Sequence, residues 1–122
     1  MSISIVWIDR EHAKLFQLSN EKMERKHLES RHQDHHTHRL DNLDQNDYGQ
    51  AFFSQVVAEL ADPLKILILG PGVGKHHFQN YLTEHWPLFA KRVVGCEAVD
   101  HPTDPQIAAL AKKFFGTTLR QG

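Results

Sequence analysis

The alternation of apolar and polar residues predicts three strands at the start of the chain. Residues 3–9 carry apolar side chains on both alternating faces, which indicates a strand in the middle of a sheet. Residues 12–18 predict a second strand, paired with the first as a hairpin through a tight turn at 9–11. Residues 23–29 are mostly charged and predict a third strand at a solvated sheet edge, where charge discourages pairing with another chain.

Two apolar runs predict further strands in the second half of the chain. Residues 66–69 are four large apolar residues between an Asp-Pro and a Gly-Pro-Gly turn signal, which is typical of a strand buried on both faces. Residues 92–99 predict another buried strand of the same kind.

Apolar residues at helical spacing predict three helices, over residues 46–61, 76–86 and 103–116. Asn46 or Asp47 would cap the first helix. Thr103 and Gln106 have the spacing of a capping box at the start of the third, and a glycine ends it. The expected buried stripes are Phe52, Phe53, Val56, Val57 and Leu60, then Phe78, Tyr81, Leu82 and Trp86, then Ile107, Leu110, Ala111 and Phe114.

The resulting element order predicts an α/β fold. Three strands followed by alternating helices and strands give a mixed five-stranded sheet, with strands one, four and five parallel and helices on both faces. We expect the sheet order 3-2-1-4-5, which is the general plan of RNase H-like folds. Residues 1–122 would form a single domain, and residues 30–46, which lack apolar periodicity, a long His-rich loop within it.

Composition narrows the class of protein. The chain has 122 residues, enough for one domain with a real core, and its 14 Lys and Arg residues nearly cancel its 15 Asp and Glu residues. The whole-chain charge therefore gives no case for sequence-independent nucleic-acid binding. No apolar run approaches the roughly 20 residues of a membrane span, and the start of the chain has no signal-peptide pattern. Cys96 is the only cysteine, which fits a reducing cytoplasm.

Three stretches of the chain resemble a known family. They are WIDREHAKLFQL at 7–18, LILGPGVGKHHF at 67–78 and DHPTDPQIAALAKKFF at 100–115. In their order and spacing they resemble the central domain of class-1 release factors of eukaryotes and archaea, which Pelota and bacterial release-factor-like proteins share. The resemblance covers nearly the whole chain. It implies the translational machinery component fold and a role in translation.

The chain departs from this family at the motif that carries its chemistry. There, the loop between the third strand and the first helix holds a Gly-Gly-Gln motif, whose glutamine helps water attack the peptidyl-tRNA ester. Residues 30–46 contain no glycine, and the pair Gly49-Gln50 lies at the expected helix start. Histidine and aspartate lack the backbone freedom of a Gly-Gly pair. We therefore expect no peptidyl-tRNA hydrolysis, whereas ribosome binding stays compatible, because Pelota-type relatives bind ribosomes without the motif.

Four histidines within the segment 30–46 form a candidate metal site. Imidazole nitrogen suits zinc, nickel or copper, and Asp34 would add an oxygen ligand. The segment lacks the cysteine pairs of a structural zinc finger, and the alternative is a solvated loop that is rich in histidine. The candidate metal ligands are His32, His35, His36 and His38.

Positive charge gathers on the third strand and the segment after it. Arginine and lysine in this region would contact RNA phosphates, and protonated histidines would add to the charge at low pH. The alternative is a solvated sheet edge. The candidate residues for contact with RNA or the ribosome are Arg25, Lys26, Arg31 and Arg39, with His27 and His32 beside them.

The segment 70–75, Gly-Pro-Gly-Val-Gly-Lys, invites comparison with nucleotide-binding loops. Leu69 stands where the Walker pattern needs its first glycine, and His76 stands where it needs serine or threonine. The dinucleotide fingerprint also fails, because Lys75 occupies the place of its third glycine. We expect a tight structural turn here.

Three carboxylates define an enzymatic alternative. Asp9 ends the first strand, where RNase H-like nucleases place a metal ligand, and Asp100 and Asp104 follow the last strand. Two-metal catalysis needs such groups to converge on two cations about 4 Å apart. We favour a hairpin role for Asp9, and a core role for Cys96 rather than a nucleophilic one.

These observations favour a small cytoplasmic, translation-associated binding protein that contacts the ribosome, tRNA or other RNA and does not hydrolyse peptidyl-tRNA. The alternatives are a metal-dependent hydrolase or nuclease, and a metal-binding interaction module. The enzymatic alternative would use the histidine segment or Asp9. The sequence establishes no cofactor, and the candidate is a transition metal such as zinc.

Overall fold

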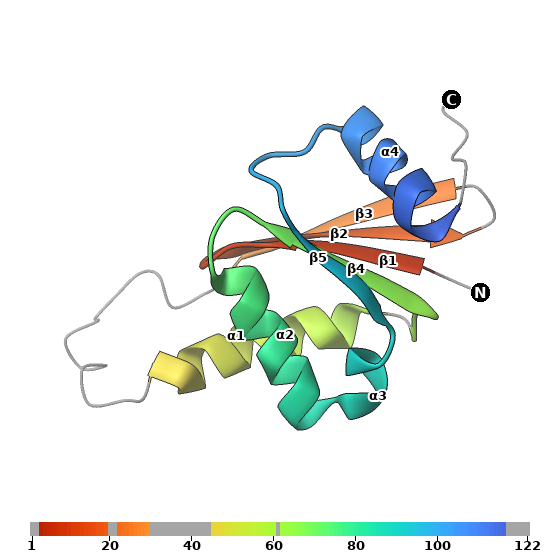
Figure 1. Ribbon diagram of the computed structural model, residues 1–122. Coiled ribbons are helices and arrows are strands. Elements are labelled where there is room, and N and C mark those ends of the chain that lie inside the picture. The colour runs from red at the N-terminus through yellow and green to blue at the C-terminus, as the bar shows by residue number, and fades with distance from the viewer. Residues whose placement is uncertain (1–2, 20–21, 30–44, 61, 117–122) are drawn as a thin grey trace.

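The computed structural model describes residues 3–19, 22–29, 45–60 and 62–116, with only the backbone described for 45–50. Its elements form a mixed sheet with helices on both faces (Figure 1). Within these ranges no helix has the length and apolar character that crossing a membrane requires.

The sheet has the strand order β3-β2-β1-β4-β5, as the sequence predicts. The strands are β1 (Ile3–Ile8), β2 (His12–Ser19), β3 (Lys22–Glu29), β4 (Lys65–Gly70) and β5 (Val93–Ala98). Strands β1, β4 and β5 run parallel, while β2 is antiparallel to both β1 and β3. Strand β1 is central, which explains why its residues on both faces are buried.

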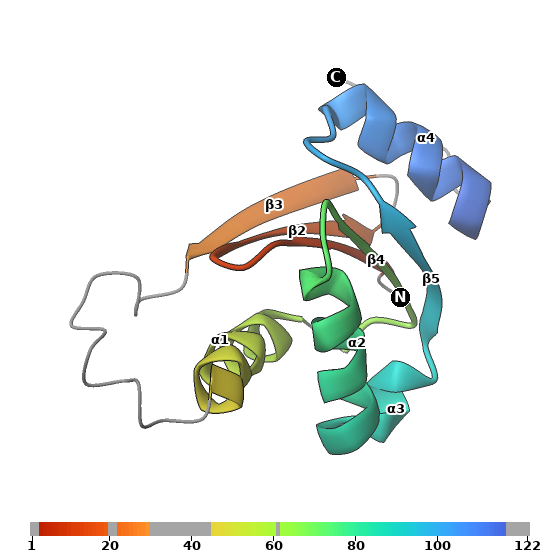
Figure 2. The same cartoon turned by 60° about the vertical axis from the view of Figure 1, so that its left-hand side comes forward.

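The helices among the described residues cover the two faces unequally. Helices α1 (Gln45–Glu59), α2 (Gly74–His85) and the short α3 (Pro87–Ala90) lie on one face, and α4 (Asp104–Phe115) lies on the other (Figures 1 and 2). We call these the α1/α2 face and the α4 face.

Each face has its own buried cluster, because successive strand residues point to opposite sides of the sheet. The α1/α2 face buries Val6, Ile8, Ala13, Leu15, Ile66 and Ile68 under Phe52, Val56, Val57, Leu60, Phe78 and Leu82. The α4 face buries Ile5, Trp7, Phe16, Leu18, Leu67 and Leu69 under Ile107 and Ala111. All three predicted stripes are confirmed in part. The structure buries Phe52, Val56, Val57 and Leu60, then Phe78 and Leu82, then Ile107 and Ala111, whereas Phe53, Tyr81, Leu110 and Phe114 are only partly buried.

Helix α4 begins with the predicted capping box. The Thr103 backbone N–H donates to Gln106 Oε1 at 2.8 Å, and the Gln106 N–H donates to Thr103 Oγ1 at 3.4 Å. Gly116 ends the helix with φ of 68°, in the left-handed region that favours glycine.

The predicted helix ends were partly wrong. Helix α1 begins at Gln45 and ends at Glu59, so Asn46 and Asp47 lie inside it and do not cap it. The second helix begins at Gly74 and ends at His85, before Pro87 opens α3, which the sequence pattern did not predict. Trp86 lies between the two helices and is 43% exposed, so it is not part of a buried stripe.

Strand β5 is less buried than predicted. It lies at the edge of the sheet, and its residues are half-buried or exposed. The apolar run of β5 resembles that of β4. Sequence alone does not tell which of two apolar strands lies at the edge of a sheet.

The predicted His-rich loop falls mostly outside the described residues. Residues 45 and 46 belong to α1. The extent of the loop over 30–44 and the single domain over 1–122 stay predictions.

Candidate functional site at the ends of strands β1 to β3

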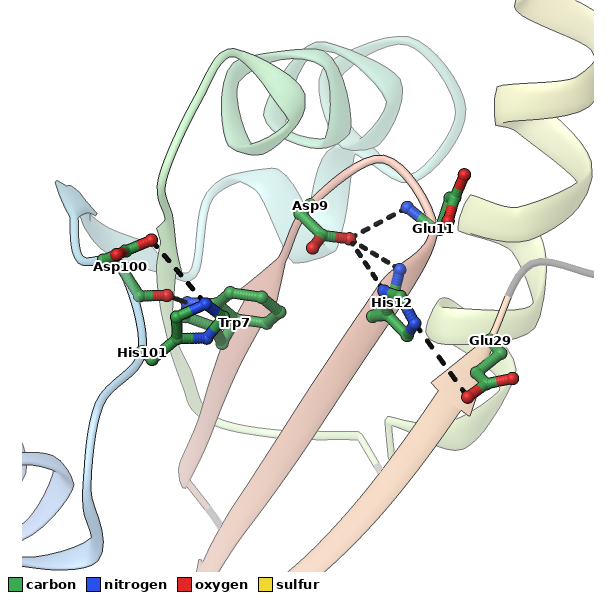
Figure 3. Close-up of polar contacts among 7 residues, drawn as sticks. All are labelled: Trp7, Asp9, Glu11, His12, Glu29, Asp100 and His101. Atoms are coloured by element: carbon green, nitrogen blue, oxygen red, sulfur yellow. Dashed lines mark hydrogen bonds and ion pairs between the residues drawn. The ribbon is translucent and has the colours of Figure 1, made fainter. Parts of the chain in front are cut away.

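The turn between β1 and β2 is fixed by Asp9. Its Oδ1 accepts hydrogen bonds from the backbone N–H groups of Glu11 at 2.8 Å and His12 at 2.7 Å (Figure 3). Its own N–H donates to the His12 carbonyl at 3.0 Å. Aspartate favours such turns because its short side chain can bond its own backbone. Asp9 is therefore a hairpin residue, as we favoured from the sequence.

The turn after β4 packs directly against this hairpin. An ideal Cβ at Gly70 would lie 2.3 Å from the Ile8 carbonyl oxygen, so only glycine allows this approach. A Cβ at Gly74 would lie 3.3 Å from the Asp9 carbonyl carbon. The glycines serve close backbone packing, as expected of a structural turn.

Lys75 closes the same turn from inside. Its side chain is buried, and its ammonium group donates a hydrogen bond to the Gly72 carbonyl oxygen. In the P-loop pattern the lysine reaches out to phosphate, whereas this lysine is turned back onto its own loop. The geometry supports the interpretation of this segment as a structural turn.

Trp7 ties β1 to the segment that follows β5. Its indole N–H donates to the Asp100 carbonyl oxygen at 2.8 Å (Figure 3). It also lies within reach of the Val99 carbonyl oxygen, at 3.0 Å. The His101 ring lies beside the indole, with 5.5 Å between ring centroids. The chain after β5 is thereby held over the end of the sheet.

The three carboxylates of the nuclease alternative have different surroundings. Asp9 is engaged in the hairpin, Asp100 pairs with His101 at 3.8 Å, and Asp104 pairs with Arg25 at 2.7 Å. Across the described ranges, they do not form a group of three whose oxygens lie close enough to share an ion. The geometry lends this alternative no support.

One cluster of metal-ligating side chains does form in the part of the chain that the structure describes. It joins His12 on β2 with His27 and Glu29 on β3, and one ligand atom from each lies within 4.8 Å of the others. From the sequence, His27 was expected only to add positive charge, and Glu29 was not a candidate. The cluster depends on the register that pairs His12 with Glu29, which connects residues far apart in the chain.

Arg25 and Lys26, two of the predicted contacts, lie on opposite faces of β3. Arg25 Nη1 lies 2.7 Å from Asp104 Oδ2 on α4, whereas Lys26 Nζ lies 2.8 Å from Glu59 Oε1 on α1. The hydrogen bond to Glu59 and its negative charge raise the pKa of Lys26 above its ordinary value. Both side chains remain about half exposed, at 58% for Arg25 and 48% for Lys26.

The remaining predicted site residues lie outside the described residues. These are Arg31 and Arg39 of the proposed RNA contact, and His32, His35, His36 and His38 of the proposed metal site. Both assignments stay predictions.

Cys96 has no sign of activation. Burial raises the pKa of its thiol, and this outweighs the opposing positive charge of Lys75. Its Sγ lies 3.8 Å from His76 Nδ1. A nucleophilic cysteine needs a lowered pKa, so the geometry favours a half-buried packing residue at the edge of the α1/α2 face.

Comparison with known proteins rests on structure alone, because no family model and no curated protein sequence matches the chain. Pelota from Archaeoglobus fulgidus matches with a TM-score of 0.63 and 22% identity, over 92% of this chain and 31% of that one. The archaeal translation termination factor aRF1 matches with a TM-score of 0.66 and 17% identity, over 95% of this chain and 35% of that one. The fold is that of a release-factor and Pelota central domain.

This match confirms at the level of fold the resemblance seen in the sequence. Dom34 from S. cerevisiae, a translation termination-like factor, matches with a TM-score of 0.53 and 10% identity, over 90% of this chain and 32% of that one. The chain therefore spans about a third of the length of these proteins. The activities of the whole factors do not follow from the shared domain fold.

Proposed function

We propose that this chain is a small, cytoplasmic, translation-associated binding protein that contacts the ribosome or RNA and does not hydrolyse peptidyl-tRNA. The single observation that carries the proposal is its fold. A domain like that of an archaeal translation termination factor accounts for 95% of the chain. On the ground of this shared fold, we extend a role in translation from the termination factor to this chain.

The connection from β3 to α1 argues against hydrolysis. In the family that the sequence resembles, this connection carries the Gly-Gly-Gln motif, and here residues 30–44 contain no glycine. Gly49, the nearest glycine, lies within α1, where its backbone is helical. A helical position does not offer the free loop backbone that the motif would need.

The charge on β3 supports a contact with phosphate. Arg25 and Lys26 are exposed enough to exchange their carboxylate partners for phosphate oxygens, at little cost because exposed ion pairs are weak. Because the two side chains lie on opposite faces of this edge strand, each would contact phosphate from its own side of the sheet. The predicted contacts Arg31 and Arg39 follow them in sequence. Such contacts supply salt-dependent binding that does not depend on nucleotide sequence.

The test is co-sedimentation of the untagged protein with ribosomes from its own host, from about 50 to 200 mM salt. We expect binding at low salt that weakens steeply as salt rises. In the double variant Arg25→Gln and Lys26→Gln, the slope of log affinity against log salt would fall by about 0.7 to 0.9 for each phosphate that is no longer neutralised.

A matched control removes two lysines from another surface. Lys112 and Lys113 lie in the last turn of α4 and are exposed. Their double change to Gln leaves the same net charge as the β3 variant and should leave binding unchanged. Equal weakening in both variants would show that only net charge matters. Absence of binding at low salt, with an intact circular dichroism spectrum, would contradict the proposed function itself.

A further inference from the structure

We propose that His12, His27 and Glu29 form a binding site for one divalent transition metal ion, with zinc as the preferred ion. This site is distinct from the predicted ligands of residues 30–46, and it does not depend on the proposed role in translation. It rests on side chains of strands β2 and β3 alone.

Strand register brings the three ligands together. In the antiparallel pair β2 and β3, His12 lies opposite Glu29, and His27 lies opposite Lys14. Directly opposite and diagonal neighbours on one face of such a pair are within side-chain reach. The three side chains therefore project from the same face, and one ligand atom from each lies within 4.8 Å of the others.

The cluster lies on the uncovered part of the α4 face. Helix α4 packs over the opposite end of these strands, so none of the described helices lies above the end of β3 at Glu29 (Figure 2). His12 is half-buried, while His27 and Glu29 are exposed. An ion and its water can therefore reach the site, and two of the ligands are free to rotate toward it.

Asp9 orients the first ligand. Asp9 Oδ1, already fixed by two backbone N–H groups, lies 3.5 Å from His12 Nδ1 (Figure 3). The other nitrogen, His12 Nε2, lies 3.9 Å from Glu29 Oε1. A carboxylate beside Nδ1 favours the tautomer that carries its proton there and leaves Nε2 to bind a metal.

The donor set selects the class of ion. Two imidazole nitrogens and one carboxylate oxygen suit zinc and its neighbours, whereas magnesium and calcium prefer all-oxygen sites. Zinc ligands lie about 2.0 to 2.2 Å from the ion, so tetrahedral ligand atoms lie about 3.4 Å apart. The ligand atoms now lie within 4.8 Å of one another, and rotation of the exposed His27 and Glu29 side chains would bring them to that shorter spacing. A water molecule would occupy the fourth position.

The stacked imidazoles show what must move on binding. The rings of His12 and His27 lie nearly parallel, with 5.7 Å between centroids and 10° between planes. Ligation of one ion by both requires the His27 ring to turn its nitrogen toward His12 Nε2. Because His27 is exposed, its ring can turn without displacing a side chain of the core.

The test uses untagged protein in which His32, His35, His36 and His38 are all replaced by Ala. This background removes the other candidate ligands, so zinc added to the metal-free protein reports the β2–β3 site. Isothermal titration should give one zinc ion per chain, with a Kd on the order of 1 to 10 µM, as for an exposed three-ligand site.

Variants in that background assign the ligands. His12→Ala and His27→Ala should each weaken zinc binding at least tenfold, and Asp9→Asn about tenfold through the orientation of His12. His101→Ala is the matched control and should leave binding unchanged, because it removes an exposed histidine that lies beside Trp7. Thermal unfolding of each variant establishes whether it is folded. Where an alanine variant does not fold, the asparagine variant at the same position, His12→Asn or His27→Asn, replaces it.

A cobalt spectrum provides a second readout of ligation. Cobalt bound by the cluster should give the visible absorption bands of a four-coordinate, tetrahedral site. His12→Ala should abolish these bands. Two results would overturn the proposal: no zinc bound by the background protein at about 100 µM, or binding that His12→Ala and His27→Ala leave unchanged. Neither result bears on ribosome association, which is measured separately.

Discussion

The two faces of the sheet differ in how completely they are covered. On the α1/α2 face, two long helices bury apolar side chains from strands β1, β2 and β4, and α3 adds Phe89 at the margin. On the α4 face, a single helix buries Ile107 and Ala111 against one end of the same strands. The other end carries polar and charged side chains, including His12, His27 and Glu29.

This difference separates a face that packing explains from a strand end that packing does not explain. The α1/α2 face holds the larger part of the core, so its residues are explained by packing. The open end of the α4 face is also held by specific hydrogen bonds, because Asp9 fixes the hairpin and Trp7 anchors the chain after β5. This end nevertheless buries few apolar side chains. A binding site that is built on such rigid strands would hold its ligands more precisely than a site on a loop.

The largest expected effect is the removal of a ring from the α1/α2 face. Phe78 is fully buried, so Phe78→Ala should lower the free energy of unfolding by about 3 to 5 kcal/mol. Phe114→Ala on the α4 face should cost about 2 kcal/mol or less, because that ring is only partly buried. Urea unfolding measures both, and equal destabilisation would contradict the unequal roles of the two faces.

The second largest loss of stability is expected at Gly70, at the end of β4. The added methyl of Gly70→Ala would meet the Ile8 carbonyl oxygen and should destabilise the protein by about 1 to 3 kcal/mol. Gly72 lies in the same turn with no atom within 4 Å of an added Cβ, so Gly72→Ala is the control and should cost little. If both variants unfold at the same urea concentration, that result would contradict the close packing of this turn against β1.

Removal of the cap of α4 comes third. Thr103→Ala removes an acceptor for the Gln106 N–H and should cost about 1 kcal/mol. Thr103→Ser keeps the hydroxyl and should stay within a few tenths of a kcal/mol of the original protein. A destabilisation in the serine variant as large as in the alanine variant would mean that the methyl group, not the cap, stabilises this helix.

The smallest effect concerns Cys96 and pH. Burial raises the pKa of its thiol above the ordinary value of 9.0, so below that pH the folded protein holds less thiolate than the unfolded chain. Alkylation at pH 8 should therefore be slower in the folded protein than in urea. The stability that this thiol contributes is fully present below its unfolded pKa and is lost as pH rises through the folded pKa. Faster alkylation of the folded protein would contradict the assignment of Cys96 as unactivated.

The fold could be predicted because its signals are local. The buried run of β4, the hairpin of β1 and β2 and the capping box at Thr103 each lie within a few residues of sequence. Topology rules then left few arrangements of these elements, and the sheet order follows. Helix α3 was missed because four residues are too few to show a helical period.

The candidate metal site could not be predicted in the same way. His12 and His27 are separated by most of two strands, and only the register of β2 against β3 shows that they share a face with Glu29. Similarly, Arg25 and Lys26 are neighbours in sequence, yet the alternation of a strand sends them to opposite faces and to different carboxylates. Charge counted along the chain therefore overstated how continuous the basic surface is among the described residues.

We propose that a release-factor-like fold without the Gly-Gly-Gln motif acts in translation as a binding protein. The most direct measurement is co-sedimentation of the full chain with ribosomes of its own host at about 50 mM salt, beside the Arg25→Gln and Lys26→Gln double variant. We expect that the original protein sediments with ribosomes and that the double variant is released at lower salt. A folded protein that stays in the supernatant at that salt would contradict it.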